Sequence, residues 1–252
     1  MKFKVFLINL DKSTDRLELC QNELKKYNID FERIPGVYGK DLTTEEVETI
    51  YDESRNDKHY KKPLSLGEIG CYLSHIKCWQ KIVDEKLDYA VILEDDFKLD
   101  SNFKEFESVF EQMQNWDYVR MAFSSRKVPI VKRHKITNTR DLVYYKKIPI
   151  NTLAQAVSLE GAKKLLANSK TIFRPVDVDM KHYWEKEINI LGIDPPLILD
   201  RYDFTSEISQ MSDGKGRMSK TSIWKNLRYV LNYKIKHFFY SFIKQDLKSF
   251  CK

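Results

Sequence analysis

The chain has 252 residues, of which 42% are hydrophobic and 13% aromatic, enough for one large domain or two small ones. With only 8 Gly and 7 Pro, this composition excludes wholesale disorder and collagen-like structure. The net charge of +6 is local, because residues 211–252 contain ten Lys/Arg and two Asp, whereas the first 210 residues contain 33 basic and 35 acidic side chains. No apolar run approaches the ~20 residues of a membrane span, and the first residues lack a signal-peptide pattern, so we expect a cytoplasmic protein.

Strand and helix patterns alternate through the first half of the sequence. Apolar runs predict strands at residues 2–8, 31–34, 89–93 and 116–123. Start signals predict helices that begin near Ser13, Thr43 and Ser65, and apolar spacing predicts another across 103–113. This alternation predicts an α/β fold with a largely parallel sheet, in which ligands bind at the carboxyl ends of the strands.

The second half of the sequence is less regular. Residues 126–147 contain eight basic side chains and one acid, which is typical of a solvated loop or hairpin, or of a mobile loop that faces an anionic ligand. A strand at 153–159 and a helix at 160–167 are expected next. Residues 210–220 have the composition of a linker, and residues 222–245 have a helical pattern.

Three consecutive acids, Glu94, Asp95 and Asp96, directly follow the apolar strand at 89–93. Like charges this close repel unless a cation or hydrogen-bond donors offset them. A divalent ion such as Mn²⁺ or Mg²⁺, held by one or two carboxylates and by nucleotide phosphates, would do so. The alternative is an acidic turn that caps the next helix. Asn9 and Arg16 follow the first strand, where a nucleotide would lie and where an arginine can bind a phosphate.

Two glycines, Gly67 and Gly70, flank Glu68 in the first turn of the helix that begins near Ser65. Glycine inside a helix costs about 0.8–1.0 kcal/mol relative to alanine, so the pair indicates close approach by a ligand or by another backbone. Ser74 and His75 follow about two turns later. A structural role for His75 is the alternative, and a nucleophilic Ser–His pair is not expected, because adjacent helix residues do not face each other.

A second acidic motif places Asp177 and Asp179 behind Pro175. Their carboxylates lie on one side only if the segment is extended. At the start of a helix they would instead interact favourably with its dipole. The four cysteines show no zinc-binding spacing, and we interpret them as reduced thiols.

Taken in chain order, these segments resemble glycosyltransferase family 25, which includes bacterial lipooligosaccharide galactosyl- and glucosyltransferases and collagen galactosyltransferase domains. No single motif is decisive, but their shared order is specific. The matching segments are residues 5–16, 36–42, 64–75, 92–96, 151–166 and 174–180.

The resemblance implies an α/β fold of GT-A type with a mostly parallel central sheet, to which the helical pattern near the C-terminus adds a helical tail. We expect a catalytic domain at 1–210, divided into a nucleotide-sugar-binding half (1–123) and an acceptor half (124–210). The charge and composition of residues 211–252 set them apart as a basic aromatic tail. The reaction would move galactose or glucose from a UDP-sugar to a lipooligosaccharide or lipopolysaccharide glycan, with inversion at the anomeric carbon. Galactose is our choice from the balance of the family.

The resemblance also assigns roles to residues. Asp96 and Asp95 would hold the Mn²⁺ or Mg²⁺ ion, and Asp177 would be the catalytic base, with Asp179 as the second choice or as a metal ligand. The expected donor-binding residues are Asn9, Arg16, Gly39, Glu68, Ser74, His75, Glu94 and Asp95. A non-catalytic protein that binds nucleotide sugars or carbohydrates is the alternative function.

Residues 221–252 combine eight aromatic side chains with Lys and Arg, a pattern typical of a helix that lies on an anionic membrane. The alternative is that this helix packs onto the domain. The two arrangements are compatible if Trp224, Leu227 and Val230 pack on the domain while later residues face lipid. We expect peripheral association with the cytoplasmic face of the inner membrane, where a lipid-linked oligosaccharide acceptor resides. Nucleic acid is not an expected partner, because the body is slightly acidic and lacks a base-stacking motif.

Overall fold

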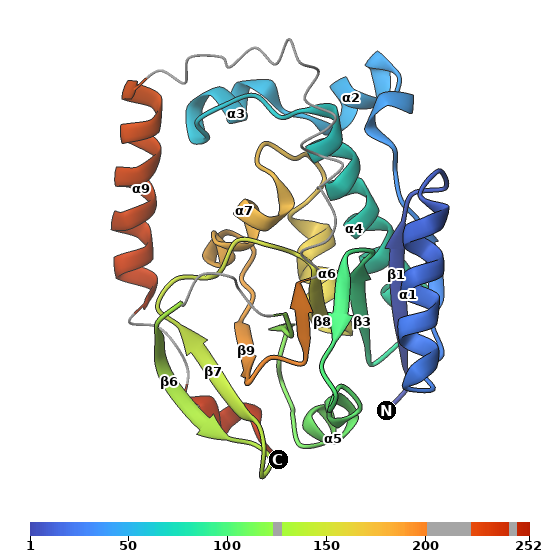
Figure 1. Ribbon diagram of the computed structural model, residues 1–252. Coiled ribbons are helices and arrows are strands. Elements are labelled where there is room, and N and C mark those ends of the chain that lie inside the picture. The colour runs from blue at the N-terminus through green and yellow to red at the C-terminus, as the bar shows by residue number, and fades with distance from the viewer. Residues whose placement is uncertain (123–127, 201–222, 242–245) are drawn as a thin grey trace.

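A central sheet runs through the protein (Figure 1), and the computed structural model describes residues 1–122, 128–200, 223–241 and 246–252. Its strands are β1 (Phe3–Asn9), β2 (Glu32–Pro35), β3 (Tyr89–Glu94), β5 (Tyr118–Arg120), β6 (Ile130–Lys135), β7 (Asp141–Tyr145), β8 (Ala154–Ser158) and β9 (Ile190–Asp194). Their order across the sheet is β2-β1-β3-β8-β5-β9-β7-β6. Two further strands, β4 (Phe97–Leu99) and β10 (Ile198–Asp200), form a small antiparallel sheet.

Most strands of the central sheet run in one direction. β1 pairs in parallel with β2 and β3, and β5 pairs in parallel with β9. β8 and β7 are each antiparallel to both of their neighbours, so six of the eight strands share one direction. The predicted α/β fold with a mostly parallel sheet is therefore confirmed, with β8 inserted in reverse between β3 and β5.

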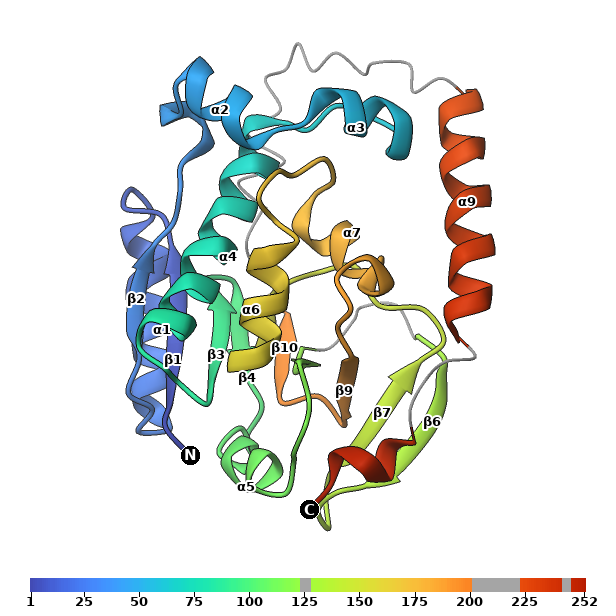
Figure 2. The same ribbon diagram turned by 180° about the vertical axis from the view of Figure 1, so that it is seen from behind.

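Helices cover both faces of this sheet (Figures 1 and 2). The α-helices are α1 (Thr14–Lys26), α2 (Thr44–Ile50), α3 (Glu53–His59), α4 (Leu66–Asp84), α5 (Glu105–Glu111), α6 (Leu159–Ala167), α7 (Val176–Met180) and α9 (Ile223–Ser241). Side chains alternate along β3, so Val91 packs with α1 and α5 on one face, whereas Ile92 packs with α4 and α6 on the other. Short 3₁₀ turns form η1 (Gly39–Asp41), η2 (Tyr183–Glu185) and η3 (Leu247–Phe250).

Several local predictions are confirmed. Capping boxes close the N-termini of α2 and α4, at Thr43 and Ser65. The basic segment forms the hairpin β6–β7, in which Arg133 pairs with Asp141, and whether it faces a ligand stays a prediction. The strand expected at 116–123 is shorter. Beyond Arg120, the carbonyl of Met121 accepts hydrogen bonds from Leu197 and Ile198, which lie outside the central sheet. The division at 123/124 and the linker at 210–220 fall outside the described residues.

The C-terminal helix is confirmed as α9, at the side of the molecule beside α3. The expected docking of Trp224 and Leu227 is wrong, because both side chains are exposed and Tyr229 and Tyr233 contact the domain instead. Phe250, one of the eight tail aromatics, is fully buried in the core. Among the described residues, no helix is both long enough and apolar enough to cross a membrane.

Candidate active site

The polar residues that follow β1 and β3 meet beside α4, at the carboxyl ends of the two strands. They line a cleft together with the loop after β2, and seven of the predicted site residues are among its walls. These seven are Asn9, Arg16, Ser74, His75, Glu94, Asp95 and Asp96. The parallel pairing of β1 with β3 explains this convergence, because it aligns Ile8 with Glu94 and so brings the two strand ends together.

Asp95 is held by hydrogen-bond donors on both sides. Arg16 Nη2 lies 2.6 Å from Asp95 Oδ1, and Asn9 Nδ2 donates to Asp95 Oδ2 at 2.7 Å. Arg33 Nε in turn donates to Asn9 Oδ1 at 3.1 Å. The charge of this central acid is therefore offset within the protein, and its side chain is only 13% exposed.

Glu94 occupies a different environment from its neighbour Asp95. His75 Nε2 lies 2.9 Å from Glu94 Oε1, and the hydroxyl of Thr152 donates to the same oxygen at 2.6 Å. Burial acts to raise the pKa of Glu94, but the hydrogen bond with His75 and the bond from Thr152 bring it below its ordinary value. Glu94 is therefore a carboxylate with a fixed orientation.

A chain of hydrogen bonds behind Glu94 orients His75. Tyr118 Oη donates to Gln155 Oε1 at 3.1 Å, and Gln155 Nε2 lies 3.2 Å from His75 Nδ1. With its oxygen occupied by Tyr118, the Gln155 amide donates to Nδ1, so Nε2 carries the proton that is donated to Glu94. No local pattern marks Thr152 or Gln155 as a site residue, because both approach the site only through the pairing of β8 with β3.

Asp96 is the most exposed of the three acids that line the cleft. Its side chain is 35% exposed, and its Oδ2 lies 3.6 Å from Arg16 Nη2. A hard divalent cation prefers carboxylate and phosphate oxygens, so the donor chemistry of Asp96 fits Mn²⁺ or Mg²⁺. Asp95 fits less well, because it would have to exchange its contacts with Arg16 and Asn9 for the ion.

Gly39 and Glu68, the other two predicted donor-site residues, do not line the cleft and belong to the structure behind its wall, where α4 meets the loop at 36–41. A Cβ atom on Gly39 would lie 1.9 Å from the carbonyl oxygen of Leu66, and one on Gly70 would lie 2.4 Å from that of Val37. The close approach expected at Gly70 is thus made by another backbone. Glu68 completes the capping box with Ser65 and pairs with Lys62 at 2.9 Å.

Ser74 also supports this wall. Its hydroxyl donates to the Gly70 carbonyl at 2.8 Å and accepts from the backbone N–H of Val37 at 2.8 Å. The first turns of α4 and the loop at 36–41 are therefore fixed to each other by glycine contacts and by one serine.

Asp177 and Asp179 have separate environments on α7. Asp179 is buried between Arg174 and Lys186, each 2.8 Å away, and accepts a hydrogen bond from the Tyr72 hydroxyl at 2.6 Å. Burial acts to raise the pKa of Asp179, but the two cations lower it overall. Asp177 Oδ1 accepts from the backbone N–H of Val178, and burial, joined by the charges of Glu94 and Glu68, raises the pKa of Asp177.

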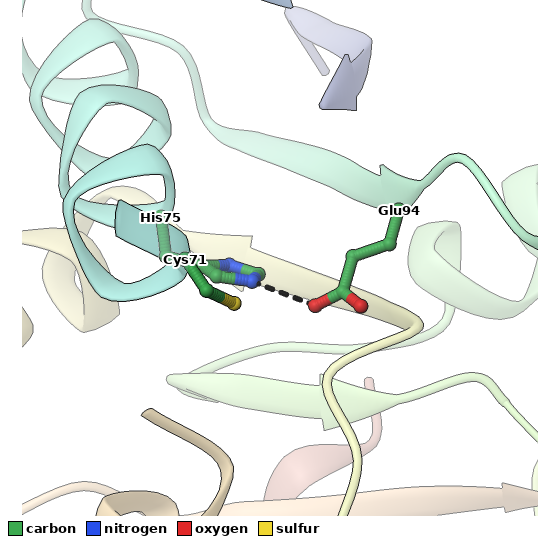
Figure 3. A group of neighbouring side chains, drawn as sticks. All are labelled: Cys71, His75 and Glu94. Carbon is green, nitrogen blue, oxygen red and sulfur yellow. Dashed lines mark hydrogen bonds and ion pairs between the residues drawn. The ribbon is translucent and has the colours of Figure 1, made fainter. Parts of the chain in front are cut away.

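One further group of side chains borders the same cleft. Cys71 and His75, one helical turn apart on α4, point toward Glu94 at the end of β3 (Figure 3), and their ligand atoms lie within 4.8 Å of one another. Burial keeps the pKa of the Cys71 thiol well above its usual range. A buried thiol is a soft ligand that Mn²⁺ and Mg²⁺ do not favour, which leaves Asp96 as the better-suited ligand.

Comparison with known proteins places this site in a family. The sequence model described as glycosyltransferase family 25 (LPS biosynthesis protein) matches residues 2–180. The chain belongs to glycosyltransferase family 25. The match includes both strand ends, the whole of α4 and the Asp177 motif, and the expected GT-A type fold agrees with the α/β core described above.

Family 25 proteins from animals are similar to this chain in sequence. Human procollagen galactosyltransferase 2 is 28% identical over 251 residues, which cover 88% of this chain and 38% of that protein. The zebrafish (Danio rerio) procollagen galactosyltransferase 1 is 27% identical over 250 residues, 88% of this chain and 39% of that protein. A glycosyltransferase 25 family member from Drosophila melanogaster is 29% identical over 180 residues, 70% of this chain and 29% of that protein. The chain thus spans less than two-fifths of these relatives.

Among solved structures, a glycosyltransferase involved in the glycosylation of the major capsid of PBCV-1 aligns with 84% of this chain and 99% of its own. The TM-score is 0.46 and the sequence identity 12%.

Proposed function

We propose that the protein is an inverting hexosyltransferase that moves galactose, or alternatively glucose, from a UDP-sugar to a growing lipooligosaccharide or lipopolysaccharide glycan. The observation that carries the proposal is the convergence of seven predicted site residues on one cleft, which contains a partly exposed acid and a fixed arginine. The family description as an LPS biosynthesis protein supports the lipid-linked glycan acceptor, and the procollagen galactosyltransferase relatives support galactose.

The donor half of the reaction would use the ends of β1 and β3. Asp96 would hold Mn²⁺ or Mg²⁺, which when bound stabilises the negative charge on the departing diphosphate. Arg16, already anchored by Asp95, is placed to bind a phosphate oxygen, and Asn9 fixes the same loop. Glu94, held by His75 and Thr152, offers a fixed carboxylate to hydroxyl groups of the donor.

The acceptor half would use Asp177. Its carboxylate takes the proton from the acceptor hydroxyl while that oxygen forms a bond to the anomeric carbon. On the opposite side, the bond from this carbon to the phosphate oxygen breaks, and UDP leaves with the electron pair. A raised pKa suits a general base, whereas Asp179 is committed to Arg174 and Lys186. Asp177 is therefore our choice over Asp179.

The lipid-linked acceptor would reside in the inner membrane, and we infer that the protein works peripherally at its cytoplasmic face through the C-terminal segment. The exposed apolar side chains of α9 support this part of the proposal.

The test is a panel of UDP-sugars assayed for UDP release with and without Mn²⁺ and with a deacylated lipooligosaccharide acceptor. We expect transfer from UDP-galactose that depends on the metal and yields a β-linked product by NMR. Binding of UDP-sugars with no UDP release for any donor and acceptor would instead favour a non-catalytic binding protein and overturn the proposal.

A further inference from the structure

Helix α9 exposes a row of large apolar side chains. They are spaced three or four residues apart, which places them on one face of the helix, and each is between 48 and 78% exposed. We name them the α9 stripe: Trp224, Leu227, Leu231, Ile235 and Phe238. An exposed apolar face of this length indicates contact with another molecule.

The opposite face of α9 is docked on the domain. Tyr233 is only 8% exposed and packs its ring against His182 and Trp184, with centroid distances of 5.3 and 5.8 Å. One turn earlier, the Tyr229 ring meets Tyr60 edge-on at 5.4 Å. Because these tyrosines are fixed to the body of the protein, the α9 stripe faces outward.

Polar contacts fix the rotation of the helix about its axis. Lys225 pairs with Asp57, and Arg228 Nη2 donates to the Asp57 carbonyl at 2.6 Å. At the other end, Lys236 lies 3.3 Å from Glu185. Bonds at both ends hold the stripe in one orientation relative to α3 and η2.

Charge distinguishes between two classes of partner for the stripe. Helix α9 contains four Lys/Arg and no acidic residue, and Arg228, Lys234 and Lys236 are exposed beside the stripe. A second copy of this chain would bring two cationic helices together, which costs energy at close range. An anionic lipid surface would instead attract the cations and accept the apolar side chains.

We propose that α9 lies flat on an anionic membrane leaflet, with the α9 stripe in the boundary between headgroups and acyl chains and the docked tyrosines facing the domain. This inference rests on the proposed function, because binding to the membrane would give the enzyme access to a lipid-linked acceptor. In both views α7, which contains Asp177, lies between α9 and α4 (Figures 1 and 2). Binding through α9 would thus orient the acceptor half of the site relative to the membrane.

The test measures co-sedimentation of the full chain with vesicles of equal parts phosphatidylglycerol and phosphatidylcholine, and with phosphatidylcholine alone. The double variant Leu231→Ser, Ile235→Ser removes two stripe side chains that are about half exposed. We expect its partition coefficient on anionic vesicles to fall about 100-fold, at about tenfold for each side chain. The matched control Asn226→Ser, Asn232→Ser changes exposed polar positions of the same helix, and we expect it to bind within about twofold of the wild type.

Other results would overturn the inference. They are equal binding by the stripe variant and the wild type, equal binding to both vesicle types, or a dimer in light scattering that the stripe variant dissociates. UDP release with a soluble acceptor is measured on the same proteins. Vesicle binding without sugar transfer would reject the proposed transferase activity alone. Sugar transfer without vesicle binding would reject the proposed contact between α9 and the membrane alone.

Discussion

Asp177 and Asp179 are two residues apart on α7, yet their surroundings assign them different roles. Asp179 is neutralised by Arg174 and Lys186, whereas burial raises the pKa of Asp177, which forms no ion pair with any cation among the described residues. We predict that Asp177→Asn lowers kcat by about 10²–10⁴-fold, because the acceptor hydroxyl loses its base. UDP-sugar affinity, measured by calorimetry, should stay within about twofold, because the amide keeps the size of the side chain.

Asp30→Asn, an exposed acid on the surface, is the control for this change and should leave turnover unaltered. Turnover near the wild-type rate in Asp177→Asn, with donor binding intact, would remove Asp177 from the mechanism.

At Asp96 the prediction concerns the metal. Asp96→Ala removes the most exposed carboxylate of the acidic triplet, so we expect the increase in UDP affinity that Mn²⁺ produces to be at least about tenfold smaller in this variant. Titration of UDP with and without Mn²⁺ measures this directly. Asp15→Ala, an exposed acid at the start of α1, should keep the full enhancement. An unchanged Mn²⁺ effect in Asp96→Ala would place the metal elsewhere.

At the scale of elements, the first turns of α4 depend on glycine. Alanine is preferred over glycine in a helix by about 0.8–1.0 kcal/mol, so Gly70→Ala would stabilise an isolated α4. In the protein, the added Cβ would lie 2.4 Å from the Val37 carbonyl oxygen, and backbone on both sides limits relaxation. We expect a net loss of about 1–3 kcal/mol in the free energy of unfolding, measured in urea, together with weaker UDP binding. Increased stability would show that the loop at 36–41 moves freely.

The sequence revealed those elements whose signals are local. The capping boxes at Thr43 and Ser65, the apolar run of β3 and the acids behind it are readable because each lies within a few consecutive residues. The reversed β8 was not readable, since nothing in its own residues states which strands flank it. Thr152 and Gln155 enter the site through that pairing, and Cys71 meets Glu94 only once α4 packs on the sheet.

At the scale of the whole molecule, the charge pattern separated the body from the tail, but the contacts of the tail depend on tertiary structure. A helical pattern over 222–245 cannot show which side meets the domain when aromatic side chains lie on both sides. The side of the helix that meets the domain is determined by residues distant in sequence. Tyr60, His182 and Trp184 pack against Tyr229 and Tyr233, and not against Trp224. Sequence alone therefore predicted an amphipathic helix and assigned its faces incorrectly.

The same contact predicts how stability depends on pH. His182 is buried beneath α9, and burial lowers its pKa to about 4, against an ordinary value near 6.5. Between these two values the unfolded chain binds more protons at this histidine than the folded protein does, so stability falls as the pH falls. From pH 7 to pH 5 we expect this histidine alone to remove about 2 kcal/mol from the free energy of unfolding.

His182→Gln isolates this contribution, because glutamine cannot be protonated in this range. The variant should be less stable than the wild type at pH 7, where it loses ring contacts with Tyr229 and Tyr233, but its stability should fall less steeply toward pH 5. Asp179 and Glu185 contribute stability that is lost as the pH falls below their ordinary pKa values of 3.8 and 4.5, so most of that loss lies below the range from pH 7 to pH 5. Urea unfolding at a series of pH values measures both slopes, and parallel slopes would mean that His182 is protonated in the folded protein.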